Sequence, residues 1–244
     1  MEPSASESPK SNFTVRFLRP EDRETVRRIC ADTGFLGSPI DPVFEDRELF
    51  ADYLTGYYTD QEPESTLVCE LDGEIVGYLM GSRRLRRHAW YQFWNNGVLF
   101  AKGIWRYFTR PYNAATRKYV AWLLTRAGSE NPHTPKELPH FHINLLPKAR
   151  KLIRTRMLVD RFLAYLVEKG EKGVYGQMVT FEGRRGEGMF ERFGFRVVDK
   201  AEVTKYRDVY SGKIFLFTII KDLTEGSHLY GNDLRDKDKA TTAP

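Results

Sequence analysis

The stretch His140-Phe-His-Ile-Asn-Leu-Leu-Pro147, together with the two segments that follow it, decides the fold. The stretch itself is typical of a β-strand that ends at Pro147, because proline lacks the amide proton that a continuing ladder needs. A helix is expected over 149–169, where apolar residues recur at helical spacing until Gly170, a residue suited to a left-handed helix cap. Residues 174–179 then form another expected strand. A strand, a helix and a strand in this order predict a parallel pair joined by a right-handed crossover.

The segments on either side of this unit predict antiparallel strands. Upstream, apolar runs at 66–71 and 74–81 flank Asp72-Gly73, a dipeptide that makes tight hairpin turns because both residues tolerate positive φ. The other expected elements are a strand at 13–18, helices near 21–30 and 46–58, a short helix at 186–193, and strands at 195–198 and 213–220. The fold class is therefore α/β, a mixed central sheet of about seven strands with helices on both faces.

Length and composition indicate one domain in a reducing compartment. The 244 residues, 41% of them hydrophobic, suit a single domain over 13–222, with residues 1–12 disordered and 223–244 a flexible tail. The two cysteines, Cys30 and Cys69, lie in apolar segments and are expected to be free and buried. No Cys/His cluster has metal-ligand spacing, so no metal site is predicted. The N-terminus lacks the basic start and apolar run of a signal peptide, and no apolar run is long enough to cross a bilayer. These features predict a cytoplasmic protein.

Residues 83–138 form an unusual basic and aromatic insertion. Between Arg83 and Gly128 there is no Asp or Glu, although this stretch holds ten Lys or Arg residues and all four tryptophans. Amphipathic helices are expected at 91–107 and 114–126, followed by a Pro/Asn/Ser-rich linker at 129–139. Such charge asymmetry marks a contact surface. Four interpretations stay open: a lid over an acceptor site, a membrane-surface element, a nucleic-acid contact, or a helical pair packed on the sheet or in a dimer.

Three stretches resemble the GNAT acyltransferase superfamily. The first is Val15-Arg-Phe-Leu18 followed by Arg19-Pro-Glu-Asp22, the second is the strand at 140–147 before a basic helix, and the third is Met189-Phe-Glu-Arg-Phe-Gly-Phe195. Their order and spacing cover 13–222 apart from the insertion. The resemblance implies the GNAT fold, with the helical insertion between the third and fourth strands. It also implies transfer of an acetyl or other acyl group from acyl-CoA to the amine of a small molecule.

The resemblance implies a cofactor site at the second of these stretches. Acetyl-CoA in this family lies where the two central parallel strands separate, and its pantetheine would pair with the backbone of Asn144, Leu145 and Leu146. Its pyrophosphate would lie on the start of the next helix, where amide groups and the helix dipole favour an anion.

The pyrophosphate loop departs from the family pattern Arg/Gln-x-x-Gly-x-Gly/Ala. Arg150 fits the first position, but Ile153 and Thr155 occupy the two glycine positions. A β-branched residue puts bulk where phosphate oxygens must approach amide groups. Binding through side chains is one interpretation, and solvated helix charge is the other. On the first interpretation the cofactor-binding residues include Arg150, Lys151, Arg154 and Thr155, with Arg156 as a further cation.

The candidate catalytic residues are His142, His140 and Glu182. The two histidines share one face of their strand with Asn144, because side chains alternate. Such a His-x-His is similar to the proton relay of arylalkylamine N-acetyltransferases, and an unperturbed histidine pKa near 6.5 suits that work. The alternative is that the histidines only hydrogen-bond a neighbouring loop, and that Glu182 is an exposed charge beside two arginines. The family's frequent general-acid tyrosine falls at Phe190, whose ring cannot donate a proton.

Two functions follow from the sequence. The favoured one is a GNAT-type N-acyltransferase that uses acetyl-CoA as co-substrate and a small-molecule amine as acceptor. The alternative is a catalytically inactive GNAT-fold binding or scaffold protein that acts through the insertion. A homodimer and a membrane surface contacting 85–126 are the candidate partners, and nucleic acid is the least favoured because no known binding module is present.

Overall fold

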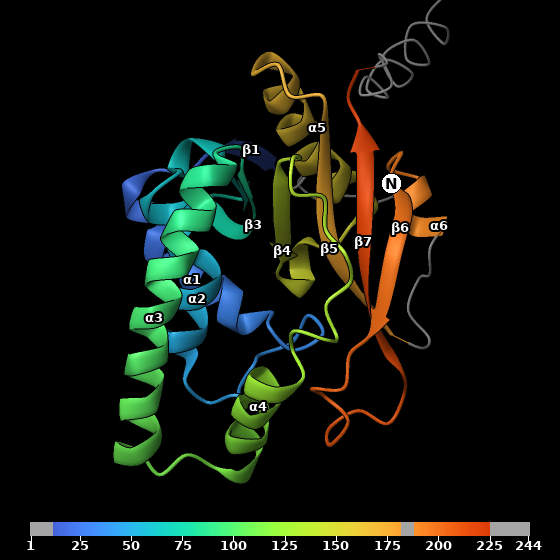
Figure 1. Cartoon of the computed structure of the whole chain (residues 1–244). Helices are drawn as coiled ribbons and strands as arrows, with labels where there is room; N and C mark the ends of the chain where they lie inside the picture. The colour runs from blue at the N-terminus through green and yellow to red at the C-terminus, as the bar shows by residue number, and fades with distance from the viewer. Residues whose placement is uncertain (1–11, 182–187, 225–244) are drawn as a thin grey trace, which may run out of the picture.

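Seven strands form one mixed sheet in the spatial order β1-β2-β3-β4-β5-β7-β6 (Figure 1). The computed structural model describes residues 12–181 and 188–224. The strands are β1 (Phe13–Phe17), β2 (Thr66–Leu71), β3 (Glu74–Ser82), β4 (His140–Leu145), β5 (Gly173–Phe181), β6 (Arg196–Glu202) and β7 (Ile214–Asp222). The helices are α1 (Arg23–Asp32), α2 (Arg47–Asp60), α3 (Leu85–Thr109), α4 (Ala114–Thr125), α5 (Leu152–Glu168) and α6 (Gly188–Glu191). Short 3-10 helices lie at Pro20–Asp22, Pro63–Ser65 and Pro147–Ala149.

The predicted parallel pair at the centre of the sheet is confirmed. β4 and β5 are parallel and connected through α5, whereas the other paired strands are antiparallel. Their ladder consists of only two pairs, His140 with Tyr175 and Phe141 with Gly176. The rest of β4 therefore has no strand partner on the β5 side.

Each face of the sheet has its own hydrophobic core. Side chains of a strand alternate between faces, so β3 contributes to both cores. On one face α5 packs against the sheet, and its buried Leu158 and Phe162 lie in one cluster with Phe141. On the other face α1 and α2 cover β2 and β3, and buried Ile29 clusters with Tyr78.

The β2–β3 hairpin forms as predicted. Asp72 and Gly73 have φ angles of 53° and 87°, the left-handed conformation that this turn needs. Cys30 and Cys69 are free and buried, as expected.

Two helix boundaries in the prediction were wrong. The insertion begins with a single long helix, α3, that starts six residues before the expected 91. It ends because Arg110 precedes a proline and takes an extended conformation, with φ −111° and ψ 140°. α5 begins at Leu152 rather than at 149, because Pro147 starts a 3-10 turn. In the described part of the chain no helix combines the length and apolar character needed to cross a bilayer.

One buried and one half-buried ion pair attach the insertion to α2. Asp46 caps α2 by accepting a hydrogen bond from the Leu49 amide over 3.1 Å, and it is only 3% exposed. The same carboxylate accepts from Arg106 Nη1 on α3 over 2.7 Å and from the hydroxyl of Tyr112. Further along, Lys102 Nζ donates to Asp52 Oδ2 over 2.8 Å. Lys102 and Arg106 of α3 thus face the body of the protein.

Candidate active site

Three histidines and a tyrosine meet where the insertion touches β4. This histidine–tyrosine cluster consists of Tyr58 on α2, His88 on α3, and His140 and His142 on β4. A hydrogen bond of 2.7 Å joins Tyr58 Oη to His140 Nε2, and Tyr58 Oη is 3.5 Å from His88 Nε2. The ring centroids of His88 and His140 are 4.6 Å apart, and those of Tyr58 and His142 are 5.6 Å apart. The predicted shared face of His140 and His142 therefore points to α2 and α3.

The histidines of this cluster are neutral at neutral pH. Burial, followed by the neighbouring His142 and His88, holds the pKa of His140 well below its usual value. Burial likewise lowers the pKa of His142 to about 4 and also lowers that of His88. Burial raises the pKa of Tyr58 well above 10, so its hydroxyl keeps its proton. A neutral imidazole can accept a proton from an amine, but the lowered pKa makes both strand histidines weaker bases than the value near 6.5 expected from the sequence. Within the described ranges, no group of three or more His, Cys, Asp or Glu is arranged to hold a metal ion.

A buried carboxylate, Glu62, fixes the start of α3 beside this cluster. It is 1% exposed and accepts hydrogen bonds from Tyr57 Oη, Ser65 Oγ and Ser82 Oγ at 2.8 to 2.9 Å. It also accepts from the Arg83 amide over 2.8 Å. Burial opposes its ionisation, but these hydrogen bonds outweigh it and its pKa is lowered. Because Ser82 ends β3 and Arg83 leads into α3, Glu62 positions the helix turn that carries His88.

The sequence prediction did not include His88, Tyr58 or Glu62. His88 lies among arginines in a stretch without clear periodicity, and Glu62 precedes a proline in what looks like an exposed turn. Only the packing of α2 and α3 brings them together. Phe190, in contrast, is buried and packs against Phe217 with ring centroids 5.9 Å apart, so it serves the core. Glu182, the third candidate base, lies outside the described residues.

Alternate residues of β4 direct their backbone N–H and C=O groups toward the edge that β5 leaves unpaired. The Leu146 amide donates to Val76 O on β3 over 2.8 Å. In an antiparallel ladder neighbouring residues direct their backbone groups to opposite edges, so Leu145 directs its groups toward the β5 side. Its carbonyl accepts from Arg150 Nε over 2.8 Å. The Asn144 side chain instead donates to Tyr78 Oη over 2.7 Å on the α1–α2 face. Of the three predicted pantetheine contacts, Leu145 has the backbone orientation that a ligand in the gap requires.

At the start of α5, the predicted phosphate-binding side chains make contacts with the protein. Arg150 donates to the carbonyl of Gly37, and Arg154 is 7% exposed and donates to Lys148 O over 3.0 Å. Thr155 Oγ1 donates to Lys151 O over 3.3 Å. No side chain caps the helix at its N-cap position, Lys151. The first turn of α5 thus keeps amide groups that no side chain caps, whereas Arg154 would have to leave its present contact to reach a phosphate.

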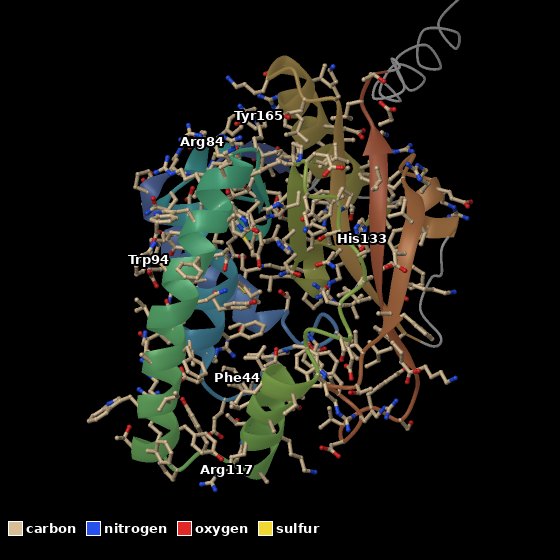
Figure 2. The ribbon with its side chains drawn as sticks, in the orientation of Figure 1. Phe44, Arg84, Trp94, Arg117, His133 and Tyr165 are labelled. Carbon is tan, nitrogen blue, oxygen red and sulfur yellow. The ribbon has the colours of Figure 1, made fainter. Side chains whose placement is uncertain are left out.

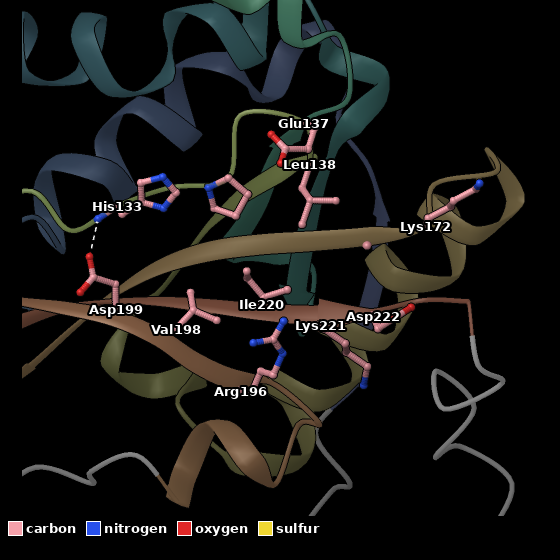
Figure 3. Close-up of a pocket in the computed structure, with 12 residues that line it drawn as sticks. His133, Glu137, Leu138, Lys172, Arg196, Val198, Asp199, Ile220, Lys221 and Asp222 are labelled. Atoms are coloured by element: carbon pink, nitrogen blue, oxygen red, sulfur yellow. Dashed lines mark hydrogen bonds between the residues drawn. The ribbon is translucent and has the colours of Figure 1, made fainter.

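A cavity of about 650 Å³ lies elsewhere, between the linker at 133–138 and strands β5, β7 and β6 (Figure 3). His133 lines the cavity, and its backbone amide donates a hydrogen bond to Asp199 Oδ2 over 2.7 Å. The lining includes Gly173, the first residue of β5, so the cavity lies at the opposite end of β5 from the unpaired edge of β4. None of the predicted catalytic or cofactor residues lines it.

Comparisons with known proteins agree with this architecture. Neither a protein-family model nor a curated protein matches the sequence. Among solved structures, SsHAT matches with a TM-score of 0.58 and 24% identity over 87% of this chain and 99% of its own. An N-acetyltransferase from Staphylococcus aureus Mu50 matches with a TM-score of 0.53 and 14% identity, over 88% of this chain and 100% of its own. A third match is a GNAT superfamily phosphinothricin acetyltransferase from Sinorhizobium meliloti, solved in complex with acetyl-CoA. Its TM-score is 0.50 and its identity 13%, over 88% of this chain and 90% of its own. The chain has the GNAT acyltransferase fold, as its sequence predicted.

Proposed function

We propose that this GNAT-fold chain is an N-acyltransferase that moves an acyl group, in the first instance acetyl, from acyl-CoA to the amine of a small molecule. The observation that carries the proposal is the two-pair ladder between β4 and β5, which ends beside a pair of neutral histidines. A gap between parallel strands offers backbone groups to the thioester arm, and the histidines supply a base next to it.

The donor would lie along the unpaired edge of β4. The pantetheine would pair with the backbone of Leu145, and the pyrophosphate would lie on the uncapped first turn of α5. Lys151, Arg150 and Thr155 are at this turn, and the positive end of the helix dipole adds to their attraction for phosphate. The S. meliloti structure, which was solved with acetyl-CoA, supports a CoA thioester as the ligand class.

The histidines would remove the proton that the attacking amine must lose. The amine nitrogen forms a bond to the thioester carbonyl carbon, the carbon–sulfur bond breaks, and CoA leaves as a thiolate that takes up a proton. His142 is partly exposed and is the first acceptor of the amine proton. His140 stands behind it and connects through Tyr58 toward His88. General-base catalysis of this kind contributes about 10²–10⁴ in rate.

Donor binding is tested by calorimetric titration of the full chain with acetyl-CoA, with free CoA as comparison. Saturable heat with acetyl-CoA is expected, weakened by Arg150→Ala because this residue holds the end of β4 against the helix turn. No heat at millimolar ligand would reject the donor site. The inactive scaffold would then be the better account, and it would also fit the buried Phe190 and the engaged Arg154.

Catalysis is tested by following CoA release over a panel of small amines. We expect His142→Ala to lower kcat by at least about 10²-fold while calorimetric binding of acetyl-CoA is unchanged. His133→Ala is the matched control, because this exposed histidine lies on the linker over the distant cavity. Equal rates for both variants would show that His142 is not the base.

A further inference from the structure

The outward face of α3 is apolar although its inward face is polar. Its large exposed residues, with their exposed fractions, are Trp90 (65%), Phe93 (71%), Trp94 (57%), Val98 (65%), Phe100 (55%), Ile104 (44%), Trp105 (70%) and Phe108 (81%). Trp94 lies on α3 at the edge of the molecule in Figure 2. Every exposed residue from Ala89 to Thr109 is uncharged.

The inward face of the same helix carries Lys102 and Arg106. Lys102 and Arg106 donate to carboxylates of α2, and His88 joins the histidine–tyrosine cluster. A helix on the surface of a globular protein has the reverse arrangement, with apolar residues inward. An exposed apolar face of this extent marks a surface that contacts something other than water.

The width of the apolar face favours a fluid partner over a second helix. At about 100° per residue, Phe100 and Val98 mark its two edges roughly 160° apart. A helix–helix seam uses two of seven positions and is narrower. Lipid chains can surround the whole arc, because they have no fixed shape. From Trp90 to Phe108 the face is about 27 Å long, so the helix would lie along a surface.

Positive charge adjoins the apolar face. Arg86 and Arg87 are exposed and precede Trp90 by about one turn, on the same side of the helix. Within the described residues, Arg86 has no carboxylate partner, and no Asp or Glu occurs between Arg83 and Gly128. Anionic lipid headgroups complement this charge. Tryptophan also prefers the boundary between headgroups and acyl chains.

We propose that the outward face of α3 docks the protein on an anionic lipid bilayer, with the helix axis along the membrane plane. The proposal does not depend on acyl transfer. Three of the four tryptophans lie on this face, so they report on it directly.

The test uses the full chain with vesicles of phosphatidylcholine alone and of equimolar phosphatidylcholine and phosphatidylserine. We expect the chain to pellet with the anionic vesicles at low salt, with a blue shift of tryptophan fluorescence. Pelleting should weaken at high salt, because salt screens the charge contribution.

Point variants then map the contact. Trp94→Asp and Phe108→Asp should each lower the partition coefficient at least about tenfold, because each removes a large apolar group from the lipid. Arg86→Glu should weaken binding to anionic vesicles only. The controls are Val209→Asp, an exposed apolar residue away from α3, and Lys136→Glu, an exposed cation on the linker, and both should bind as the unchanged chain does.

Two results would overturn the proposal. One is absence of pelleting and of a blue shift with both vesicle types. The other is a dimer in sedimentation velocity that Trp94→Asp dissociates, which would assign the face to a second copy of the chain. Folding of each variant is checked by circular dichroism, and the two Asp variants at different ends of the face guard against one of them failing to fold.

Discussion

Replacing Asp46 by alanine should destabilise the protein much more than loss of an ordinary helix cap. The carboxylate is 3% exposed and serves both the first turn of α2 and the guanidinium of Arg106. Loss of the cap costs about 1 kcal/mol. Removing one member of a buried ion pair costs about 3–5 kcal/mol, because the remaining charge stays buried. Glu48 Oε2, 2.6 Å from Arg106 Nη2, compensates part of this loss.

The expected total for Asp46→Ala is thus about 4 kcal/mol in the free energy of unfolding. For a chain of this size the melting temperature falls by about 2–4 °C per kcal/mol, which gives a decrease of about 8–16 °C. Urea unfolding followed by circular dichroism and a thermal melt measure both quantities. Asp46→Asn separates the two contributions, because asparagine caps a helix well but carries no charge.

Arg110→Ala is the matched control. Arg110 Nη1 lies 3.5 Å from the same carboxylate, but its side chain is 50% exposed, so its loss should cost under about 1 kcal/mol. The ion pair with Arg106 does not stabilise the attachment of the insertion if Asp46→Ala lowers the free energy of unfolding by no more than the loss of a helix cap. The same conclusion follows if Asp46→Asn leaves the free energy of unfolding unchanged.

The remaining predictions concern the sheet and the histidines. The free energy of unfolding should be greatest above about pH 6.5 and fall by up to about 3 kcal/mol toward pH 4, because a histidine with a lowered folded-state pKa takes up its proton first in the unfolded chain. Urea titrations at several pH values measure this for the unchanged chain and for His142→Gln, whose stability should depend less on pH. Identical pH profiles for the two chains would contradict the prediction. Gly81→Ala should cost about 1–3 kcal/mol, because the added methyl would lie 2.8 Å from the backbone oxygen of His140. Gly103→Ala, whose methyl meets nothing nearer than 3.7 Å, should be neutral or stabilising in a thermal melt, and equal melting temperatures for the two variants would refute the steric argument. Tyr58→Phe should cost about 1–3 kcal/mol in urea unfolding because it leaves Nε2 of His140 without its partner, and a loss below that range would mean that water replaces the hydroxyl.

Local sequence patterns were sufficient for the order of strands and helices. The Asp72-Gly73 turn and the strand–helix–strand unit around β4 depend on neighbours in the chain, so the hairpin and the parallel pair could be predicted. The start of α3 could not, because aromatic and basic residues occur on both of its faces and blur the helical period. Its inverted polarity follows from the carboxylates of α2, which are distant in sequence.

The candidate site was predictable only in part, for the same reason. Alternation along a strand placed His140 and His142 on one face without any knowledge of the fold. His88 and Glu62 gain their importance from tertiary contacts and carry no local signal. Arg154 was predicted either to bind phosphate or to be a solvated helix charge, but its side chain is buried and donates to Lys148 O.

The polar seam between α3 and α2 limits how the insertion can be engineered. A segment that looks like an addition to a compact fold is often removed as a unit. Excising this one would leave the carboxylates of Asp46 and Glu48 without the cations that now neutralise them, and Asp52 would keep only Arg27 of α1. It would also uncover His140, which packs against His88. Function of the insertion is therefore better dissected by substitutions on its outer face than by deletion, since a truncated chain would confound loss of a contact with loss of the fold.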